Sequence, residues 1–206
     1  NGAGTMLELL GTALCDAGEA VLVPSPMYLA LPNDFGKRFD TKVYPVPLPY
    51  DQASNTFALS VDVVNQAYQK AKTEGVTVRA FLLLNPNNPT GEMYPAKLVE
   101  ELIEWCRSQQ IHFISDEVYA LSVFEGEDKF VSAGKIMLEK YSRCDFVHLV
   151  YSFSKDFTLN GFRVGVLYTH NSDLMTFCRS CSYFTGISSH TQHLLSHVIT
   201  DDEFMQ

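Results

Sequence analysis

The chain has 206 residues, of which 46% are hydrophobic and 19% are charged, the composition of a globular domain with a sizeable core. Its formal net charge of -9 argues against nucleic acid as the main partner, because contact with a phosphate backbone requires a basic surface. No apolar run approaches the length that spans a bilayer, so no membrane partner is expected either.

Short apolar runs alternate along the chain with stretches of helical periodicity. In chain order we expect a helix over residues 5–16, strands over 20–24 and 41–47, a helix over 61–74, a strand over 78–85, a helix over 95–110, a strand over 111–115, a helix over 135–140, strands over 147–153 and 164–169, and a helix over 172–184. The prolines of 41–47 place that strand near a sheet edge, and the polar segment 48–56 is expected to be a turn-rich connection. Apolar strands separated by helices indicate a three-layer α/β fold, with a mainly parallel sheet covered on both faces.

Polar motifs stand at the ends of three of these strands. The segment 85–91 (Asn-Pro-Asn-Asn-Pro-Thr-Gly) follows one strand, 116–119 (Asp-Glu-Val-Tyr) follows the next, and 152–155 (Ser-Phe-Ser-Lys) ends a third. In sheets of this kind ligands bind beyond the carboxyl ends of the strands. We therefore expect the three motifs to converge on one crevice.

The third motif contains a lysine, Lys155, between candidate phosphate ligands. A lysine in a desolvated site can act as an amine nucleophile toward a carbonyl. Serine hydroxyls and an arginine fork bind phosphate well, and Ser152, Ser154 and Arg163 supply both. A surface lysine in a turn explains the bare Ser-x-Ser-Lys pattern more simply, so Lys155 needs support from the other motifs.

The second motif places Asp116 at the end of a buried strand. A buried carboxylate must be paired, and a protonated pyridine nitrogen is a suitable partner. Tyr119 and the side-chain amide of Asn88 could then bond a phenolic oxygen on the same ring. An aspartate that caps a helix is the simpler explanation of Asp-Glu-x-Tyr alone.

Two further segments could complete such a site. The small residues at the start of the chain, including Ala3 and Gly4, precede an apolar helix, whose N-terminus can bind an anion through backbone amides. Tyr28 follows an expected strand and could stack on a planar ring. An ordinary turn and an ordinary packed tyrosine explain these features equally well when each is taken alone.

Taken together, the motifs resemble those of a known family. Asn88-Pro89-Thr90-Gly91, Asp116-x-x-Tyr119, Ser152-x-Ser154-Lys155 and Gly161-Phe162-Arg163-Val164-Gly165 occur in the order found in class I and II aminotransferases of the aspartate aminotransferase fold (fold type I). Within that family, Asp116-Glu117-Val118-Tyr119 and Ser154-Lys155-Asp156-Phe157 look most similar to the aminocyclopropane-carboxylate synthase and synthase-like branch.

The resemblance implies pyridoxal 5'-phosphate (PLP) as the cofactor, with Lys155 as the catalytic lysine that bonds the cofactor and moves the Cα proton. It implies these cofactor contacts: Asp116 to the pyridine nitrogen, Asn88 and Tyr119 to the phenolic oxygen, Tyr28 stacked on the ring, and Ser152, Arg163 and the amides near Ala3 and Gly4 on the phosphate, with Ser154 as a further candidate. It also implies a homodimer. We expect residues 1–206 to be the large, PLP-binding domain of a longer protein, without its N-terminal segment and its C-terminal small domain.

Three functions fit these features. The first is an aminotransferase that exchanges an amino group between an amino acid and a 2-keto acid. Thr90 mildly favours this function, because the synthases commonly have leucine at this position. The second is a lyase of the synthase type that acts on S-adenosylmethionine. The third is a non-catalytic relative with a regulatory or interaction role, although such relatives usually lose the lysine or its partners.

The remaining cysteine and histidine patterns are expected to be structural. The five cysteines form no even framework, which favours a reducing compartment and a cytoplasmic protein. Cys178 and Cys181 have the spacing of half a zinc site but no second pair, and His190, His193 and His197 are expected on a partly buried helix face. We predict no metal site.

Overall fold

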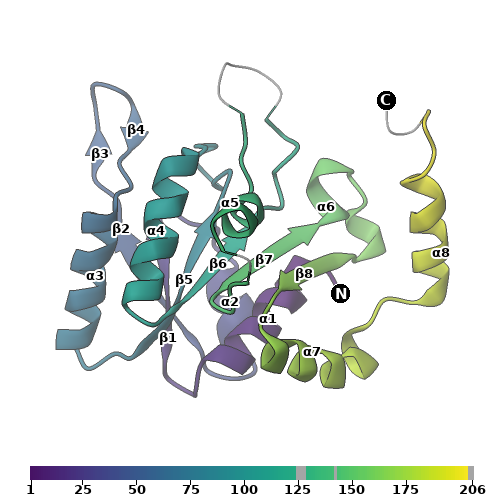
Figure 1. Cartoon of the computed structure of the whole chain (residues 1–206), viewed down its shortest axis with the longest axis horizontal. Coiled ribbons are helices and arrows are strands. Elements are labelled where there is room, and N and C mark those ends of the chain that lie inside the picture. The colour runs from purple at the N-terminus through teal and green to yellow at the C-terminus, as the bar shows by residue number, and fades with distance from the viewer. Residues whose placement is uncertain (124–128, 142, 204–206) are drawn as a thin grey trace.

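The computed structural model describes residues 1–123, 129–141 and 143–203, whose core is a six-stranded sheet with strand order β2-β1-β5-β6-β7-β8 (Figure 1). The strands are β1 (Ala20–Ser25), β2 (Lys42–Pro47), β5 (Val78–Leu84), β6 (His112–Asp116), β7 (Val147–Ser152) and β8 (Gly165–Thr169). All neighbours are parallel except β8, which runs antiparallel to β7. The mainly parallel sheet and the edge position of β2 are confirmed.

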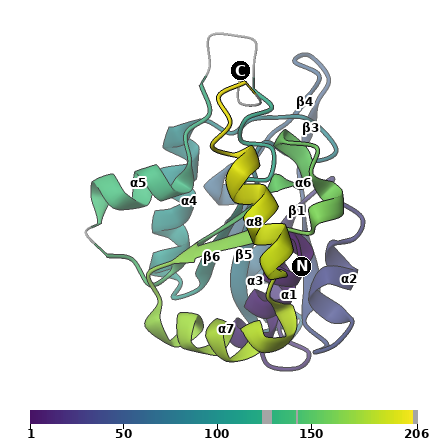
Figure 2. The same ribbon diagram turned by 90° about the vertical axis from the view of Figure 1, so that its right-hand side faces the viewer.

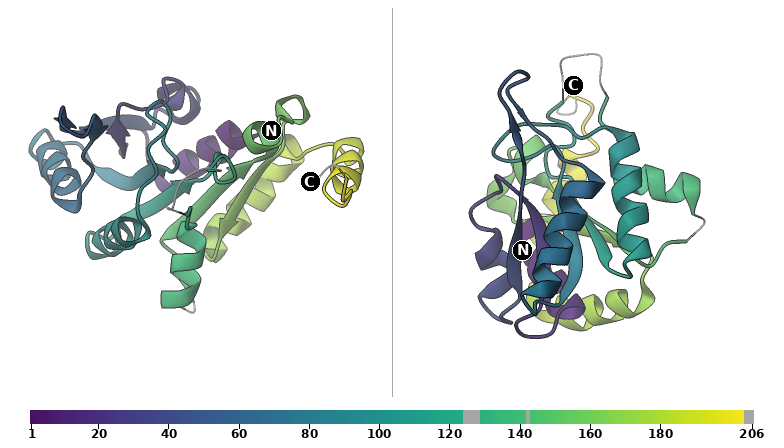
Figure 3. Two further views of the ribbon diagram at one scale, coloured as in Figure 1. Left: turned by 90° about the horizontal axis from the view of Figure 1, so that it is seen from above. Right: turned by 90° about the vertical axis from the view of Figure 1, so that its left-hand side faces the viewer.

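Helices cover both faces of this sheet. They are α1 (Ala3–Leu14), α2 (Leu31–Gly36), α3 (Val61–Thr73), α4 (Ala96–Ser108), α5 (Ala133–Lys140), α6 (Phe153–Asp156), α7 (Ser172–Thr185) and α8 (Ser189–Val198), with a 3-10 turn η1 over Asn160–Phe162. Figure 3 shows α3, α4 and α5 on one face and α1 and α2 on the other. The predicted three-layer α/β class is therefore confirmed.

The central strands have apolar side chains on both faces because each face has its own core. Phe81 and Phe113 pack into the cluster formed with α3, α4 and α5, and their ring centroids lie 5.9 Å apart. Leu82 and Ile114, the next residues along β5 and β6, pack into the cluster formed with α1, α2 and the start of α7. Successive side chains of a strand point to opposite faces, so a strand covered on both sides reads as one continuous apolar run.

Several short elements differ from the sequence expectation. Helices α2 and α6 were not expected, and the segment expected to be a connection contains a hairpin of β3 (Tyr50–Asp51) and β4 (Thr56–Phe57). The hairpin is supported by the rings of Tyr50 and Phe57, whose centroids lie 5.1 Å apart. These elements are too short to produce a clear periodic pattern, and contacts distant in sequence determine them.

The expectation of a partly buried histidine face near the C-terminus is wrong. His190, His193 and His197 are all exposed on α8, which lies beyond the β8 edge and faces the viewer in Figure 2. The face is exposed because α8 buries only Leu195. In the described parts of the chain, no three His, Cys, Asp or Glu side chains form a group that could hold a metal ion. The five cysteines are free thiols.

None of the helices described is both long and apolar enough to cross a membrane.

Candidate active site

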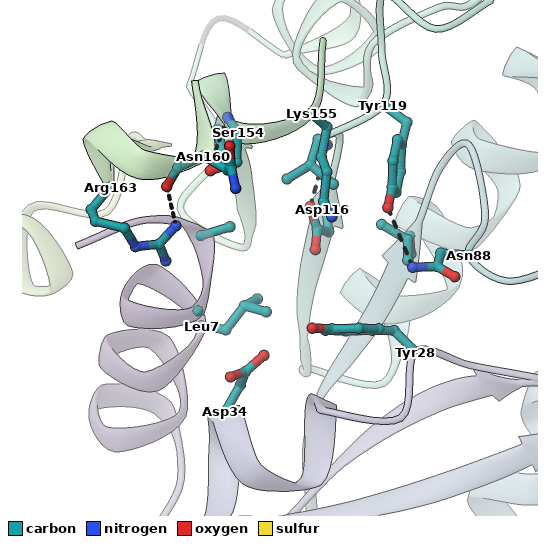
Figure 4. A pocket seen from close by; sticks show the side chains of 15 residues that line it. Leu7, Tyr28, Asp34, Asn88, Asp116, Tyr119, Ser154, Lys155, Asn160 and Arg163 are labelled. Carbon is teal, nitrogen blue, oxygen red and sulfur yellow. Dashed lines mark hydrogen bonds between the residues drawn. The ribbon is translucent and has the colours of Figure 1, made fainter. Parts of the chain in front are cut away.

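The carboxyl ends of β5, β6 and β7 open into a pocket of about 240 Å³ (Figure 4). Every residue predicted for the site lines it: Ala3, Gly4, Tyr28, Asn88, Asp116, Tyr119, Ser152, Ser154, Lys155 and Arg163. The pocket also has lining residues that the sequence did not single out: Leu7, Asp34, Leu84, Val118 and Asn160. The expected convergence of the three strand-end motifs is confirmed, whereas the chemical role of each residue stays a prediction.

Lys155 enters the pocket from α6, the four-residue helix that directly follows β7. Ser152 caps the start of this helix, and its hydroxyl accepts a hydrogen bond from the Ser154 amide at 3.1 Å. The Lys155 ammonium nitrogen lies 5.7 Å from the centroid of the Tyr119 ring. In Figure 4 Lys155 extends into the pocket from one side and Tyr28 lies across the other. A planar ring placed between them would have the amine on one side and an aromatic face on the other.

Asp116 ends β6 at the bottom of the pocket and is 5% exposed. Its carboxylate accepts one hydrogen bond, from the Val118 amide at 3.3 Å, and no described cationic side chain forms an ion pair with it. Burial raises the pKa of Asp116 to about 7, and the hydrogen bond from the Val118 amide and, to a smaller extent, the positive charge of Lys155 oppose this only in part. Such a carboxylate lacks a cationic hydrogen-bond donor, and a protonated ring nitrogen would supply one.

Asn88 and Tyr119 present their polar atoms at one point in the pocket wall, where the Asn88 side-chain amide donates a hydrogen bond to the Tyr119 hydroxyl at 3.3 Å. The other asparagines of this loop are used within it. Asn85 Oδ1 accepts from the Tyr94 amide at 3.0 Å, and Asn87 Nδ2 donates to the Thr90 hydroxyl at 2.8 Å. The loop therefore holds its own shape and leaves Asn88 to face a ligand.

The opposite end of the pocket can bind an anion. Helix α1 begins there at Ala3, and Gly2 before it makes no side-chain cap to the helix, so the first amides are not occupied by a capping group. Arg163 lies alongside, with Nη1 donating to the Asn160 carbonyl at 2.9 Å and Nη2 to the Asn1 carbonyl at 3.3 Å. A fixed guanidinium beside a helix N-terminus is a suitable cradle for a phosphate group.

Two glycines allow this cradle to form. Gly2 has φ 84, and a Cβ atom there would lie 2.5 Å from Arg163 Nη2. Gly165, at the start of β8, would place a Cβ atom 2.4 Å from the backbone of Gly2. The contact at Gly165 is with backbone, so only glycine lets β8 approach the start of α1 so closely, and at Gly2 the positive φ favours glycine.

The two serines around Lys155 differ in how their hydroxyls are used. The Ser152 hydroxyl is buried, 3.0 Å from the Val164 carbonyl and 2.8 Å from the Ser154 hydroxyl. Ser152 therefore joins β7 to the start of β8 in addition to lining the pocket. Ser154, the further candidate in the sequence analysis, has the less committed hydroxyl of the two.

Asp34 is the charged pocket residue that sequence reasoning missed. It lies on α2, near the start of α1, and a Cβ atom at Gly4 would be 3.1 Å from its Oδ1. Burial raises the pKa of Asp34, with Glu8 acting in the same direction and Lys37 against it. Asp34 belongs to no motif, and its place in the pocket follows from α2, which is too short to be predicted from its pattern.

The donor set of this pocket fits PLP. The buried Asp116 lacks a cation, which the ring nitrogen provides, and the cradle of Arg163 and the α1 amides suits the phosphate. Asn88 and Tyr119 suit the phenolic oxygen, and Lys155 suits the aldehyde.

Comparison with known proteins adds to this geometry. Residues 1–206 match the family model described as aminotransferase class I and II. The chain is 38% identical over 207 aligned positions to 1-aminocyclopropane-1-carboxylate synthase 6 of Oryza sativa subsp. japonica, covering 100% of this chain and 37% of that protein. The chain thus spans well under half of that relative.

Solved structures share the fold. A mutant aspartate aminotransferase of Thermus thermophilus matches with a TM-score of 0.80 and 22% identity, over 98% of this chain and 49% of that one. A PLP-bound C-S lyase from Staphylococcus hominis matches with a TM-score of 0.74 and 21% identity, over 88% of this chain and 43% of that one. A protein named as an aminotransferase and a protein named as a lyase therefore share this fold.

Proposed function

Because the chain belongs to the class I and II aminotransferase family, which is PLP-dependent, we propose that it acts on amino acids as an aminotransferase. The observation that carries the proposal is the buried Asp116 in the same pocket as Lys155, with the phosphate cradle at the other end. These groups match the ring nitrogen, the aldehyde and the phosphate of one cofactor. The substrates on this proposal are an amino acid and a 2-keto acid.

On this proposal Asp116 contributes to cofactor binding and Lys155 to proton transfer. When bound, PLP supplies an aldehyde that condenses with amines and a ring that withdraws electrons from the substrate Cα. Asp116 keeps a proton on the ring nitrogen, because a buried carboxylate stabilises a cation beside it. With cofactor and substrate bound, the free amine of Lys155 would accept the substrate Cα proton at Nζ and serve as its donor when the proton is returned.

The other residues hold the ring in register with Lys155. Arg163, Ser154 and the first amides of α1 would hold the phosphate, and Tyr28, across the pocket from Lys155, would pack against the ring. Asn88 and Tyr119, whose polar atoms lie together in the pocket wall, would donate hydrogen bonds to the phenolic oxygen. Fixing the ring at both ends places the substrate Cα within reach of Nζ, and this positioning accelerates proton transfer.

A lyase acting on S-adenosylmethionine is the second candidate, and the identity to 1-aminocyclopropane-1-carboxylate synthases favours it. Loss of the Cα proton to Lys155 is common to both reactions, so the pocket described here serves either one. Thr90 does not separate them, because its hydroxyl is used inside its own loop. It accepts from Asn87 and donates to Glu92 Oε2 at 2.9 Å.

Parallel assays of the full-length protein test the proposal. One follows amino transfer from amino acids to 2-keto acids, and the other follows formation of aminocyclopropane carboxylate from S-adenosylmethionine. We expect amino transfer that Lys155→Ala abolishes and that Lys135→Ala, a change in a surface ion pair with Glu139, leaves intact. Product from S-adenosylmethionine alone would replace the proposal with the second candidate. A protein that binds no PLP and catalyses neither reaction would indicate a non-catalytic relative.

A further inference from the structure

Helix α6, which carries Lys155, cannot fix the lysine by itself. It contains four residues, and an isolated helix of this length is unstable in water. Its first turn is capped by Ser152, but that cap lies at the other end of the helix from Lys155. The position of Lys155 must therefore depend on contacts made near the end of α6.

Asp156, the last residue of α6, makes these contacts with one half-buried carboxylate. Oδ2 accepts hydrogen bonds from the Leu121 amide and the Tyr151 hydroxyl, each at 3.0 Å. Oδ1 accepts a hydrogen bond from the Ser122 hydroxyl at 2.8 Å. The carboxylate thus joins α6 to β7 and to the segment that follows Tyr119.

The last of these connections reaches the pocket. The Ser122 amide donates to the Tyr119 carbonyl at 3.0 Å, so the turn that Asp156 holds begins at Tyr119 itself. Lys155 and Tyr119 are also neighbours across the pocket, with Nζ 5.7 Å from the ring. A shift of this turn would move Tyr119 relative to Lys155.

We infer that Asp156 is a positioning residue, which holds Lys155 in register with Tyr119 through its bonds to Tyr151, Leu121 and Ser122. The inference rests on the proposed function, since the register matters only if both residues contact one cofactor. Tyr151 is suited to this task because burial, and then its bond to Asp156, raise its pKa, so its hydroxyl stays a donor.

The chain offers a matched control for a carboxylate of this kind. Asp51 accepts hydrogen bonds from the Ala53 amide at 2.9 Å and from the Ser54 hydroxyl at 2.7 Å. It lies in the β3–β4 hairpin, which projects at the β2 edge of the sheet, the edge opposite β8 (Figure 1). Removing Asp51 deletes similar bonds without touching the pocket.

The experiment compares Asp156→Ala, Asp156→Asn and Asp51→Ala in the full chain. Folding is checked by thermal melting, and the readouts are the PLP dissociation constant and the pH at which the absorbance of the bound cofactor changes. We expect Asp156→Ala to weaken PLP binding on the order of tenfold and to shift the absorbance transition. Asp156→Asn should recover much of the loss, because its carbonyl can still accept from Leu121 and Tyr151. Asp51→Ala should stay within about twofold of the wild type.

Two single-bond variants keep the test decisive if Asp156→Ala does not fold. Tyr151→Phe and Ser122→Ala each remove one bond and should each weaken PLP binding about threefold, with the same direction of absorbance shift. If a folded Asp156→Ala, or both Tyr151→Phe and Ser122→Ala, bind PLP as well as Asp51→Ala does, the inference is overturned and the proposed function is unaffected. A wild-type protein that leaves PLP unbound would overturn the proposed function and the inference with it.

Discussion

At the scale of single residues, Asp116 is a buried carboxylate that lowers the stability of the folded chain when it is ionised. Burial raises the pKa of its carboxyl to about 7, so the folded chain retains a proton that the unfolded chain loses above about pH 4. Stability contributed by this proton is fully present below about pH 4, decreases as the pH rises from there, and is lost once the pH has passed through 7. The full loss is on the order of 4 kcal/mol for a shift of this size.

Replacing Asp116 with asparagine should therefore change stability and binding in opposite directions. In urea unfolding of the cofactor-free protein, Asp116→Asn should be more stable than wild type by up to about 4 kcal/mol at pH 8, by less than half of that at pH 5, and nearly equal below about pH 4. Its affinity for PLP should fall tenfold or more, since the charge beside the ring nitrogen is gone. Glu117→Gln is the control, because the Glu117 carboxylate is bonded within the chain to Ser115 and Ala133. Unchanged PLP affinity in Asp116→Asn would contradict the assigned role.

The sequence predicted those site residues that lie at or directly after the end of a buried strand. Asp116 directly ends a buried strand and Lys155 follows one, so pattern and topology were enough to bring them together. Asp34 has no such marker, and Asn160 lies in the short turn η1, whose path depends on Arg163 having left-handed backbone angles. Such residues enter the pocket through tertiary structure that local patterns do not encode.

At the scale of elements, the antiparallel strand β8 closes the phosphate end of the pocket. Ser152 at the end of β7 pairs with Gly165 at the start of β8, so the connection between them lies at the pocket. This direction brings Arg163, just before β8, to the start of α1. A parallel β8 would instead begin at the opposite end of the strands, away from the pocket. The apolar run 164–169 predicted the strand, but its pattern carried no information on direction.

A methyl group at Gly165 should separate β8 from α1. In Gly165→Ala the new Cβ would meet the backbone of Gly2 and the Ala3 amide at 2.4 and 2.9 Å, so one of the two segments must move. We expect a loss of about 1–3 kcal/mol in unfolding free energy. PLP binding should weaken more than binding of pyridoxal, which lacks the phosphate. Gly161→Ala, with open space around the new atom, is the control. Equal losses for PLP and pyridoxal would contradict this account of the phosphate end.

At the scale of the whole molecule, the fold brings together segments that are far apart in the sequence. The start of α1, the ends of β5, β6 and β7, and Arg163 before β8 all meet at one pocket. The alternation of buried strands and helices predicted this layering, because a parallel sheet needs a covered face on each side. The meeting of α1 with Arg163 is a tertiary feature, and it entered the sequence analysis only through the family resemblance.

Reductive trapping of the cofactor tests the central assignment most directly. The full chain is incubated with PLP, reduced with borohydride, digested and mapped by mass spectrometry. We predict a stable pyridoxyl modification on Lys155, together with an absorbance band that Lys155→Ala lacks. Modification of a different lysine, or no bound chromophore with PLP in excess, would contradict the identification of Lys155 as the cofactor-binding residue.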